Sequence, residues 1–469
     1  MSARPSGSGS RGSFTISAAR REAFAILLEV ERGSGHSDDL MRGARVSALS
    51  LPDRHLCTAL VMGTLRWQIR LDALIRPLLA KPNARLDPEV QIALRLGALQ
   101  LLFLDRIPAH AAIGESVALA KAAGHTFAAG MVNAVLRRLA GQPKPEAAPE
   151  YGLTPAAIAE ASAHPLWMVE RWVADYGFET ACRICSHGQE QPQLALRLNF
   201  AELEAELVAG GIQLEPGSLL ASARQVVAGD VTATEAFRDG RVRIMDEGSQ
   251  VIAELAGCGE RILDCCAAPG GKTLVLAERN PEAEITACEV NPARLDALRR
   301  RIADTHDAKL QAQLQFVEAD AAKLAPEPVY DLVLADVPCS GTGTLGRNPE
   351  IRHRLRFEDL SRQAERQRAI LGAALRILKP GGRALYSTCS LEPEENAEVV
   401  EAVLGDLTGF RRVSLAGRVR ELLSQGRLTG AGVETLLAGI AADGSLTLIP
   451  GRSHDGFFAA VLERSGGRV

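Results

Sequence analysis

The stretch Arg261-Ile-Leu-Asp-Cys-Cys-Ala-Ala-Pro-Gly-Gly-Lys-Thr273 changes from a strand pattern to a helix pattern across one short turn. Its apolar start at 261–264 predicts a strand, and the Gly-rich turn at 267–273 leads into a helix predicted at 274–279. Glycines after a strand let a ligand approach the backbone, and the first turn of the next helix presents free N–H groups. The stretch therefore predicts a ligand-binding unit near the start of an α/β domain.

The same alternation of strand and helix continues toward the end of the chain. Further strands are predicted at 285–289, 314–317, 330–335, 383–386 and 456–462, and helices at 292–302 and 357–378. Alternation of this kind implies a parallel sheet that is covered by helices on both faces. Residues 241–469 are therefore predicted to form an α/β Rossmann-like domain, in which ligands bind at the carboxyl ends of the strands.

Two smaller regions precede this domain. Residues 16–140 carry helical periodicity, with breaks at Pro82 and Pro108, and predict an all-α domain. A polar, Pro-rich linker at 141–150 leads to residues 151–240, whose short helix and strand patterns predict a small α+β module. The Ser/Gly/Arg-rich residues 1–15 are predicted to be a disordered tail rather than a signal peptide.

The composition narrows the class of protein. The chain is 46% hydrophobic and 23% charged, as is usual for soluble globular proteins, and no apolar run is long enough to span a membrane. The formal charge of −4 gives no overall attraction to nucleic acid. Residues 16–140 nevertheless carry 16 Lys/Arg against 11 Asp/Glu, which indicates either an anionic partner or a solvated helical surface. Nine cysteines without framework spacing favour free thiols and a cytoplasmic location.

Acidic residues at the ends of predicted strands indicate the kind of ligand. Glu289 ends the second strand and is placed to bind ribose hydroxyls, while Asp320 follows the third strand and is placed to accept from an adenine amino group. The Gly-rich turn lacks the GxxxxGK[ST] and GxGxxG spacings, so neither a nucleoside triphosphate nor NAD is expected. S-adenosylmethionine, an adenosine without phosphates, fits this pattern. Two solvated surface acids are the alternative.

Two cysteines each follow a strand pattern and define the candidate chemistry. They lie in Asp336-Val-Pro-Cys-Ser340 and Ser387-Thr-Cys-Ser390. Two thiols and a carboxylate in one crevice indicate covalent catalysis through a thiolate. Spacing alone does not show whether Cys339 or Cys389 attacks, and either could be a buried structural thiol.

Two further patterns bear on partners. Arg347, Arg352 and Arg354 follow the first cysteine motif, and a basic run beside a catalytic crevice is typical of contacts to RNA phosphates, although an exposed loop explains it as well. Cys182-Arg-Ile-Cys185 has no second pair of cysteines, so no metal site is predicted from it.

Three motifs in this order resemble the RNA cytosine-5 methyltransferases of the Sun/NOL1/NOP2 family. They are Leu263-Asp-Cys-Cys-Ala-Ala-Pro-Gly-Gly-Lys-Thr273, Asp336-Val-Pro-Cys-Ser-Gly-Thr-Gly343 and Tyr386-Ser-Thr-Cys-Ser-Leu-Glu-Pro-Glu-Glu-Asn396. The resemblance extends over nearly the whole chain.

The remaining matches lie on both sides of these motifs. Residues 16–140 resemble a NusB-type RNA-binding domain, with Gly63-Thr-Leu-Arg66 and Asn133-Ala-Val-Leu-Arg-Arg-Leu139 as its marks. The segments His164–Trp172 and Asp246–Gln250 resemble those that precede the catalytic domain, and Asp455-Gly-Phe-Phe458 resembles the end of the family's sequences.

The resemblance implies a role for each motif residue. Cys389 is implied as the nucleophile that adds to cytosine C6, Cys339 as the residue that assists product release, and Asp336 as a hydrogen-bond partner on the N3 side of the base. Glu289 is implied to bind the ribose and Asp320 the adenine, with Asp336 at the junction of cofactor and base. The methionine portion is implied to lie against Cys266, Ala267, Ala268, Pro269, Gly270, Gly271 and Lys272.

The predicted function is transfer of a methyl group from S-adenosylmethionine to C5 of a cytosine in RNA. The NusB-like domain favours 16S ribosomal RNA, and transfer RNA is the alternative substrate. A non-catalytic RNA-binding assembly factor is a further alternative, against which the intact cysteine pair argues. The protein is expected to act as a monomer without a metal ion.

Overall fold

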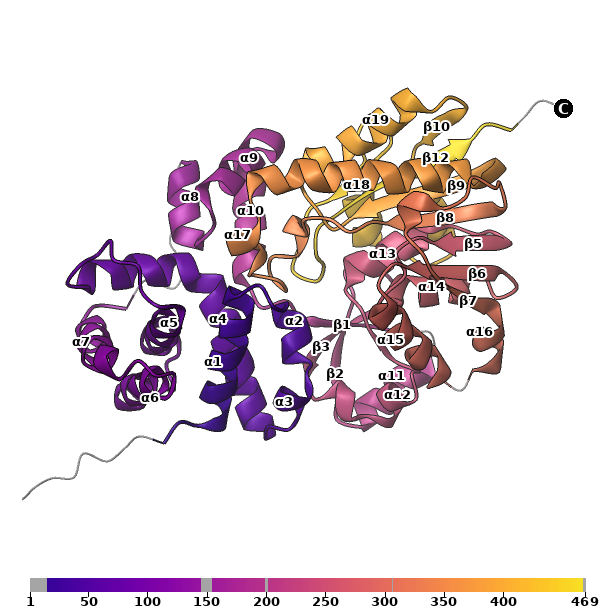
Figure 1. Cartoon of the computed structure of the whole chain (residues 1–469). Coiled ribbons are helices and arrows are strands. Elements are labelled where there is room, and N and C mark those ends of the chain that lie inside the picture. The colour runs from indigo at the N-terminus through magenta and orange to yellow at the C-terminus, as the bar shows by residue number, and fades with distance from the viewer. Residues whose placement is uncertain (1–14, 145–153, 199–200, 306, 467–469) are drawn as a thin grey trace, which may run out of the picture. The chain divides into compact units, whose positions relative to one another are not determined.

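The computed structural model describes residues 15–144, 154–198, 201–305 and 307–466 (Figure 1). The tail predicted at 1–15 lies outside the described residues up to residue 14, as does the predicted linker from residue 145 onward. The chain divides into two compact units. The first contains residues up to Gln189 together with Arg347–His353, and the second contains Glu190–Gly346 and the residues from Arg354 onward.

The first unit is helical, and the all-α domain predicted for its N-terminal part is confirmed. Its buried centre includes Leu94, Leu96 and Leu99 on α5, each at most 1% exposed. The main helices are α1 (Ala18–Glu31), α4 (Leu51–Ile75), α5 (Pro88–Phe103), α6 (Ala109–Ala122) and α7 (Ala129–Ala140), with the short α2 (Ser37–Met41) and α3 (Ala44–Ser47) between α1 and α4. No helix within the described ranges is long and apolar enough to cross a membrane.

Three more helices belong to this helical unit. They are α8 (Pro155–Ser162), α9 (Leu166–Tyr176) and α10 (Phe178–Gln189). The sequence analysis placed them in the α+β module, but the structure groups them with the preceding helices. A helical pattern by itself does not show which neighbour a helix packs against, and this accounts for the difference.

The α+β module begins the second unit. Its four antiparallel strands lie in the order β2-β3-β1-β4 and pair in one sheet. The elements are β1 (Leu194–Arg197), α11 (Ala201–Ala209), β2 (Gln213–Pro216), β3 (Ala223–Ala228), α12 (Glu235–Arg238) and β4 (Arg243–Ile244).

The larger sheet follows, and the predicted Rossmann-like α/β fold is confirmed. Five strands are parallel in the order β9-β8-β5-β6-β7: β5 (Arg261–Asp264), β6 (Glu284–Glu289), β7 (Leu314–Glu318), β8 (Tyr330–Asp336) and β9 (Leu378–Thr388). The last strand, β12 (Phe457–Arg464), runs antiparallel to β9, and β10 (Phe410–Val413) and β11 (Leu446–Leu448) pair with β12. The sheet is therefore mixed rather than wholly parallel, because an apolar strand pattern does not encode direction.

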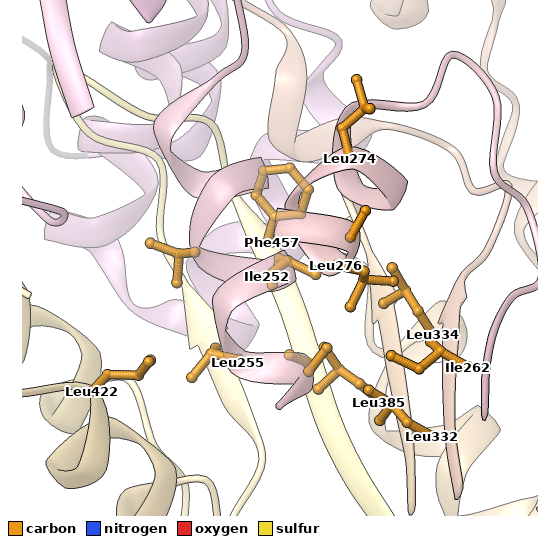
Figure 2. Close-up of a cluster of buried hydrophobic side chains, with 14 of the residues drawn as sticks. Ile252, Leu255, Ile262, Leu274, Leu276, Leu332, Leu334, Leu385, Leu422 and Phe457 are labelled. Atoms are coloured by element: carbon orange, nitrogen blue, oxygen red, sulfur yellow. The ribbon is translucent and has the colours of Figure 1, made fainter. Parts of the chain in front are cut away.

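Helices cover both faces of this sheet because apolar side chains alternate along its strands. Ile262, Leu334 and Leu385 face the core under α13 (Glu247–Ala256), α14 (Gly271–Arg279), α15 (Pro292–Ala303) and α20 (Ala416–Ser424). Figure 2 shows these side chains packed against Ile252 and Leu276 of two of the helices. Leu263 and Val333 face the opposite core under α18 (Phe357–Arg376) and α19 (Ala397–Asp406). Burial on both faces fixes the carboxyl ends of β5, β6 and β8 at one edge.

Candidate active site

The Gly-rich turn joins β5 to α14 at the carboxyl edge of the sheet. Gly270 has a φ of +99°, and a Cβ at this position would overlap the side chain of Leu298. Only glycine suits a backbone that is left-handed and this tightly enclosed. The guanidinium of Arg294 donates to the carbonyl of Ala268 at 2.7 Å and holds the turn from α15. The turn at the start of α14 is therefore held in one tight conformation by Leu298 and Arg294.

The two acids predicted for the ribose and the adenine lie at the ends of neighbouring strands. Glu289 ends β6, is 4% exposed, and accepts from the backbone N–H of Asn291 at 3.0 Å. Asp320 follows β7 and accepts from the backbone N–H of Ala322 at 3.1 Å. That hydrogen bond and the neighbouring Lys323 lower the pKa of Asp320. Both groups can accept hydrogen bonds from the hydroxyls and amino group of an adenosine.

Asp264 is a buried carboxyl group that the sequence analysis did not single out. Burial raises its pKa to about 7, against the opposing effect of a hydrogen bond from Thr273. The hydroxyl of Thr273 lies 2.7 Å from Oδ2 of Asp264. The contact ties the end of β5 to the first turns of α14. The sequence could have identified Asp264 by its position as the last residue of the predicted strand at 261–264, because ligands bind at the carboxyl ends of such strands.

Cys339 and Cys389 lie together, as their positions after adjacent strands predict. β8 and β9 are parallel neighbours, with Asp336 opposite Ser387. The Sγ atoms of Cys339 and Cys389 are 3.2 Å apart. This contact, burial and the negative charge of Glu395 raise the pKa of Cys339 well above its usual range. At neutral pH the Cys339 group is therefore a thiol beside the second sulfur.

Asp336 forms a charged pair beside the cysteines. Its Oδ2 accepts from Nζ of Lys272 at 2.7 Å, and its Oδ1 accepts from the hydroxyl of Ser387 at 2.7 Å. Burial opposes the charged form of Lys272, but Asp336 and the nearby Cys389 outweigh it, so the pKa of Lys272 is raised. The ammonium also lies 5.3 Å from the ring centroid of Phe457. The site therefore combines two thiols, one carboxylate and one ammonium at a single edge of the sheet.

Backbone contacts fix the two cysteine loops against each other. The N–H of Gly343 donates to the carbonyl of Cys389 at 2.9 Å, and the N–H of Leu391 donates to the hydroxyl of Thr342 at 2.9 Å. A Cβ at Gly343 would overlap the carbonyl oxygen of Gly456. The glycine is therefore required by the close approach of the two loops and β12.

The three arginines predicted to bind RNA phosphates differ in their surroundings. Arg352 is 2% exposed and donates to the carbonyls of Arg66 at 3.2 Å, Ala163 at 3.3 Å and Gly188 at 2.8 Å, all within the helical unit. Burial lowers the pKa of Arg352 to about 9. A guanidinium that is enclosed and bound to three carbonyls cannot reach a phosphate, so the RNA-binding prediction for Arg352 is corrected to a structural role.

Arg347 and Arg354 are partly exposed and remain predicted RNA contacts. The Cys182-Arg-Ile-Cys185 pair lies on α10, with Cys185 buried. Over the described ranges, no group of three or more His, Cys, Asp or Glu side chains is arranged to hold a metal ion.

Models of three known families match successive parts of the chain. The NusB family matches residues 17–141, the ferredoxin-like domain of RsmF/B-like methyltransferases matches residues 164–226, and the 16S rRNA methyltransferase RsmB/F family matches residues 256–463. The ferredoxin-like match includes α9 and α10 together with β1, β2 and most of β3.

Individual relatives cover nearly the whole chain. The probable ribosomal RNA small subunit methyltransferase B of Bacillus subtilis is 32% identical over 95% of this chain and 98% of its own length. The ribosomal RNA small subunit methyltransferase B of Pseudomonas syringae pv. tomato is 33% identical over 89% of this chain and 91% of its own. The crystal structure of PH0851 has the same fold, with a TM-score of 0.76 and 23% identity over 97% of this chain and 100% of that chain.

Proposed function

Because the chain belongs to the RsmB/F family of 16S rRNA methyltransferases, we propose that this S-adenosylmethionine-dependent RNA methyltransferase modifies C5 of a cytosine in 16S rRNA. The observation that carries the proposal is the 3.2 Å contact between the sulfurs of Cys339 and Cys389, next to the Lys272–Asp336 pair. A methyltransferase acting on an amino group needs no thiol nucleophile, whereas C5 of cytosine is too weak a nucleophile to react without activation.

The proposed chemistry begins with covalent activation of the base. The Cys389 thiolate adds to C6 and forms a C–S bond, which converts C5 into an enamine-like carbon. Lys272 supplies positive charge beside the sulfur, and its ammonium can stabilise negative charge that develops on the N3 side of the base. Asp336 holds this ammonium and is proposed to form a hydrogen bond on the N3 side of the base.

Release of the product reverses the addition. After C5 is methylated, its remaining proton is lost to a base, the C–S bond breaks, and the C5–C6 double bond is restored. Cys339 is proposed to assist this step because its sulfur contacts that of the nucleophile. The buried thiol is held at the reacting centre without itself being a second negative charge.

The residues at the carboxyl edge fit S-adenosylmethionine. Glu289 and Asp320 offer acceptors for the ribose and the adenine at the ends of neighbouring strands. Cys266 through Lys272 are proposed to line the methionine portion. When bound, S-adenosylmethionine supplies the electrophilic methyl group.

The target base must leave any stacked helix for a thiolate to reach C6. A loop or another single-stranded site in the RNA is therefore expected. The NusB-like helices and the α+β module are proposed to hold the surrounding RNA, with Arg347 and Arg354 close to the cysteine motif in sequence.

The test uses three RNA substrates and one modification map. The full chain is incubated with labelled S-adenosylmethionine and free 16S rRNA, assembled small subunits or transfer RNA, and 5-methylcytosine is mapped in each. We expect 5-methylcytosine at one position of 16S rRNA. If only transfer RNA were modified, transfer RNA would be the substrate in place of 16S rRNA. Methylation at a base atom other than C5 would overturn the proposed chemistry. Folded protein that binds the cofactor and labels none of these RNAs would favour an RNA-binding assembly factor.

A further inference from the structure

We propose that Glu395 is a positioning residue that sets the separation of the Cys339 and Cys389 sulfurs. The inference rests on the proposed function, since it assigns a task to Glu395 in the two-cysteine reaction. Glu395 lies in the Pro-Glu-Glu-Asn segment after the second cysteine motif, and its side chain is fully buried.

One carboxylate accepts hydrogen bonds from both cysteine loops. Its Oε1 accepts from the backbone N–H of Ser340 at 2.8 Å, and its Oε2 accepts from the hydroxyls of Ser340 and Ser390. These serines directly follow Cys339 and Cys389, and their own Oγ atoms are 3.0 Å apart. The carboxylate therefore connects the two loops at the positions next to the reactive sulfurs.

Gln367 of α18 completes the arrangement. Its Nε2 donates to Oε1 of Glu395 at 2.9 Å and to the carbonyl of Pro338 at 2.9 Å. Cys339 is thereby held on both sides, through Pro338 before it and Ser340 after it. We call Glu395, Gln367, Ser340 and Ser390 the carboxylate clamp.

The neighbouring Asn396 holds the second loop in the same way. Its Nδ2 donates to the carbonyl of Ser390 at 2.9 Å, and its Oδ1 accepts from the hydroxyl of Thr388 at 2.6 Å. Each loop is thus fixed on both sides of its cysteine, and Glu395 joins the two loops at the residues directly after the cysteines. Since misplacement by about 1 Å can slow a reaction about 100-fold, loss of this connection is expected to act on the chemical step.

The first experiment measures the separation of the sulfurs without any RNA. Diamide oxidises two thiols to a disulfide and is itself reduced to the hydrazine, taking up the two hydrogens. We compare the rate at which Cys339 and Cys389 cross-link, located by peptide mapping, in the wild type, Glu395→Ala and Glu395→Gln. The control is Glu398→Ala, which removes an exposed glutamate three residues further along the chain.

We expect Glu395→Ala to cross-link at least about tenfold more slowly than the wild type, and Glu398→Ala to cross-link at the wild-type rate. Glu395→Gln should fall between the wild type and Glu395→Ala. Its amide oxygen can still accept from Ser340 and Gln367, and its NH2 group can donate to the serine hydroxyls. A wild-type or faster rate in Glu395→Ala would overturn the proposal. Equal losses in Glu395→Ala and Glu395→Gln would also overturn it, because they would indicate that the charge matters rather than the bridge.

The second experiment measures methyl transfer with saturating RNA and cofactor. We expect Glu395→Ala to lower kcat about 100-fold, with the KM for S-adenosylmethionine changed less than threefold, measured at a temperature at which the variant is folded. Should Glu395→Ala not fold, the double variant Ser340→Ala/Ser390→Ala removes the two hydroxyl donors instead. That variant is expected to show slower cross-linking and a lower kcat, and wild-type values for both would overturn the proposal.

The two experiments separate this inference from the function on which it rests. If the wild-type protein modified no cytosine, the proposed function would fail, while the cross-linking comparison would still decide whether Glu395 sets the separation of the sulfurs. If cytosine were methylated and Glu395→Ala kept the wild-type kcat, the function would stand and the role of Glu395 would be overturned.

Discussion

The ammonium of Lys272 lies 2.7 Å from Oδ2 of Asp336 and joins the Gly-rich turn to the strand that precedes the first cysteine loop. Lys272 lies in the turn that is predicted to bind the cofactor, and Asp336 is the last residue of β8. Because the pair is only partly exposed, with side-chain exposures of 14% and 24%, each charge depends on the other for compensation. The pair therefore connects the turn predicted to bind the cofactor to the strand that leads to Cys339.

Replacing Lys272 with methionine keeps the length and the apolar stem but removes this charge. We expect Lys272→Met to lower kcat about 100-fold, because one preorganised charged donor at a developing negative charge has an effect of this size. The measurement is methyl transfer at saturating RNA and cofactor. Lys309→Met serves as the control, since Lys309 forms an exposed pair with Glu282. A wild-type kcat in Lys272→Met would contradict the role of the ammonium.

The two cysteines are expected to fail at different steps. Cys389→Ala should abolish both methyl transfer and the covalent protein–RNA adduct, since no thiolate is left to add to C6. Cys339→Ala should keep the nucleophile but lose assistance in release, so the adduct should accumulate. Denaturing gel electrophoresis of reactions with labelled RNA distinguishes these outcomes. An adduct that accumulates in Cys389→Ala instead would reverse the two assignments.

Helices and strands with a clear local pattern could be predicted from the sequence. The position of the two cysteine loops at one edge of the sheet could be predicted as well. The strand at 261–264, the following turn and the helix at 292–302 agree with β5, the start of α14 and α15 within a few residues. In contrast, the sequence predicts a long helix at 357–378 and the next strand only from residue 383. The helix ends at Arg376, and β9 already begins at Leu378. The start of β9 is set by its pairing with β8 and β12, and the local sequence carries no information about these partners.

Side chains within one motif show the same limit. Glu395 accepts from donors on two loops that are far apart in sequence, and its place beside the chemically identical Glu394 gives no sign of this. The basic run after the first cysteine predicted phosphate contacts, whereas Arg352 is enclosed by carbonyls from residues 66, 163 and 188. The roles of Glu395 and Arg352 depend on partners that are far away in the sequence, so motif spacing alone could not predict them.

Gly343 should tolerate no side chain. Its Cβ would overlap the Gly456 carbonyl and lie 2.9 Å from the carbonyl oxygen of Cys389, so Gly343→Ala must displace the loops that hold both sulfurs. We expect methyl transfer to fall at least about 100-fold. In the control Gly405→Ala, the new methyl group meets open space on α19, and stability should rise by about 0.5–1 kcal/mol. Activity and thermal unfolding of both variants test this contrast, and wild-type activity in Gly343→Ala would contradict it.

The arginines after the first cysteine motif should separate into two kinds. Arg354→Ala should weaken RNA binding and make the slope of log K against log salt shallower by about one, as expected when one phosphate contact is lost. Arg352→Ala should leave that slope unchanged and destabilise the helical unit by about 2–4 kcal/mol, since three buried carbonyls lose their donor. RNA binding over a salt series, together with thermal unfolding, measures both effects. An unchanged slope in Arg354→Ala would remove it from the RNA interface.

Glu254 should make the stability of the second unit depend on acid pH. Its fully buried carboxylate accepts from Arg197 at 2.7 Å, Arg279 at 2.8 Å and Arg427 at 3.2 Å. Burial alone would raise its pKa, but the guanidinium groups of Arg279 and Arg197 outweigh burial and lower it from 4.5 to about 2. Because the folded-state pKa lies below the unfolded value, the stabilisation is complete above pH 4.5 and is lost as the pH falls toward 2.

The size of this effect follows from the shift in pKa. A shift from 4.5 to about 2 corresponds to about 3 kcal/mol. The free energy of unfolding of Glu254→Gln should therefore be lower than that of the wild type at pH 7, and the difference should shrink by about 3 kcal/mol between pH 5 and pH 2. Urea denaturation across this range measures it. Glu282→Gln, which removes an exposed partner of Lys309, should show no such convergence, because a solvated carboxylate gains little from its pair. If the difference in the free energy of unfolding between Glu254→Gln and the wild type stayed constant with pH, the arginines would not lower the pKa of Glu254 in the folded state.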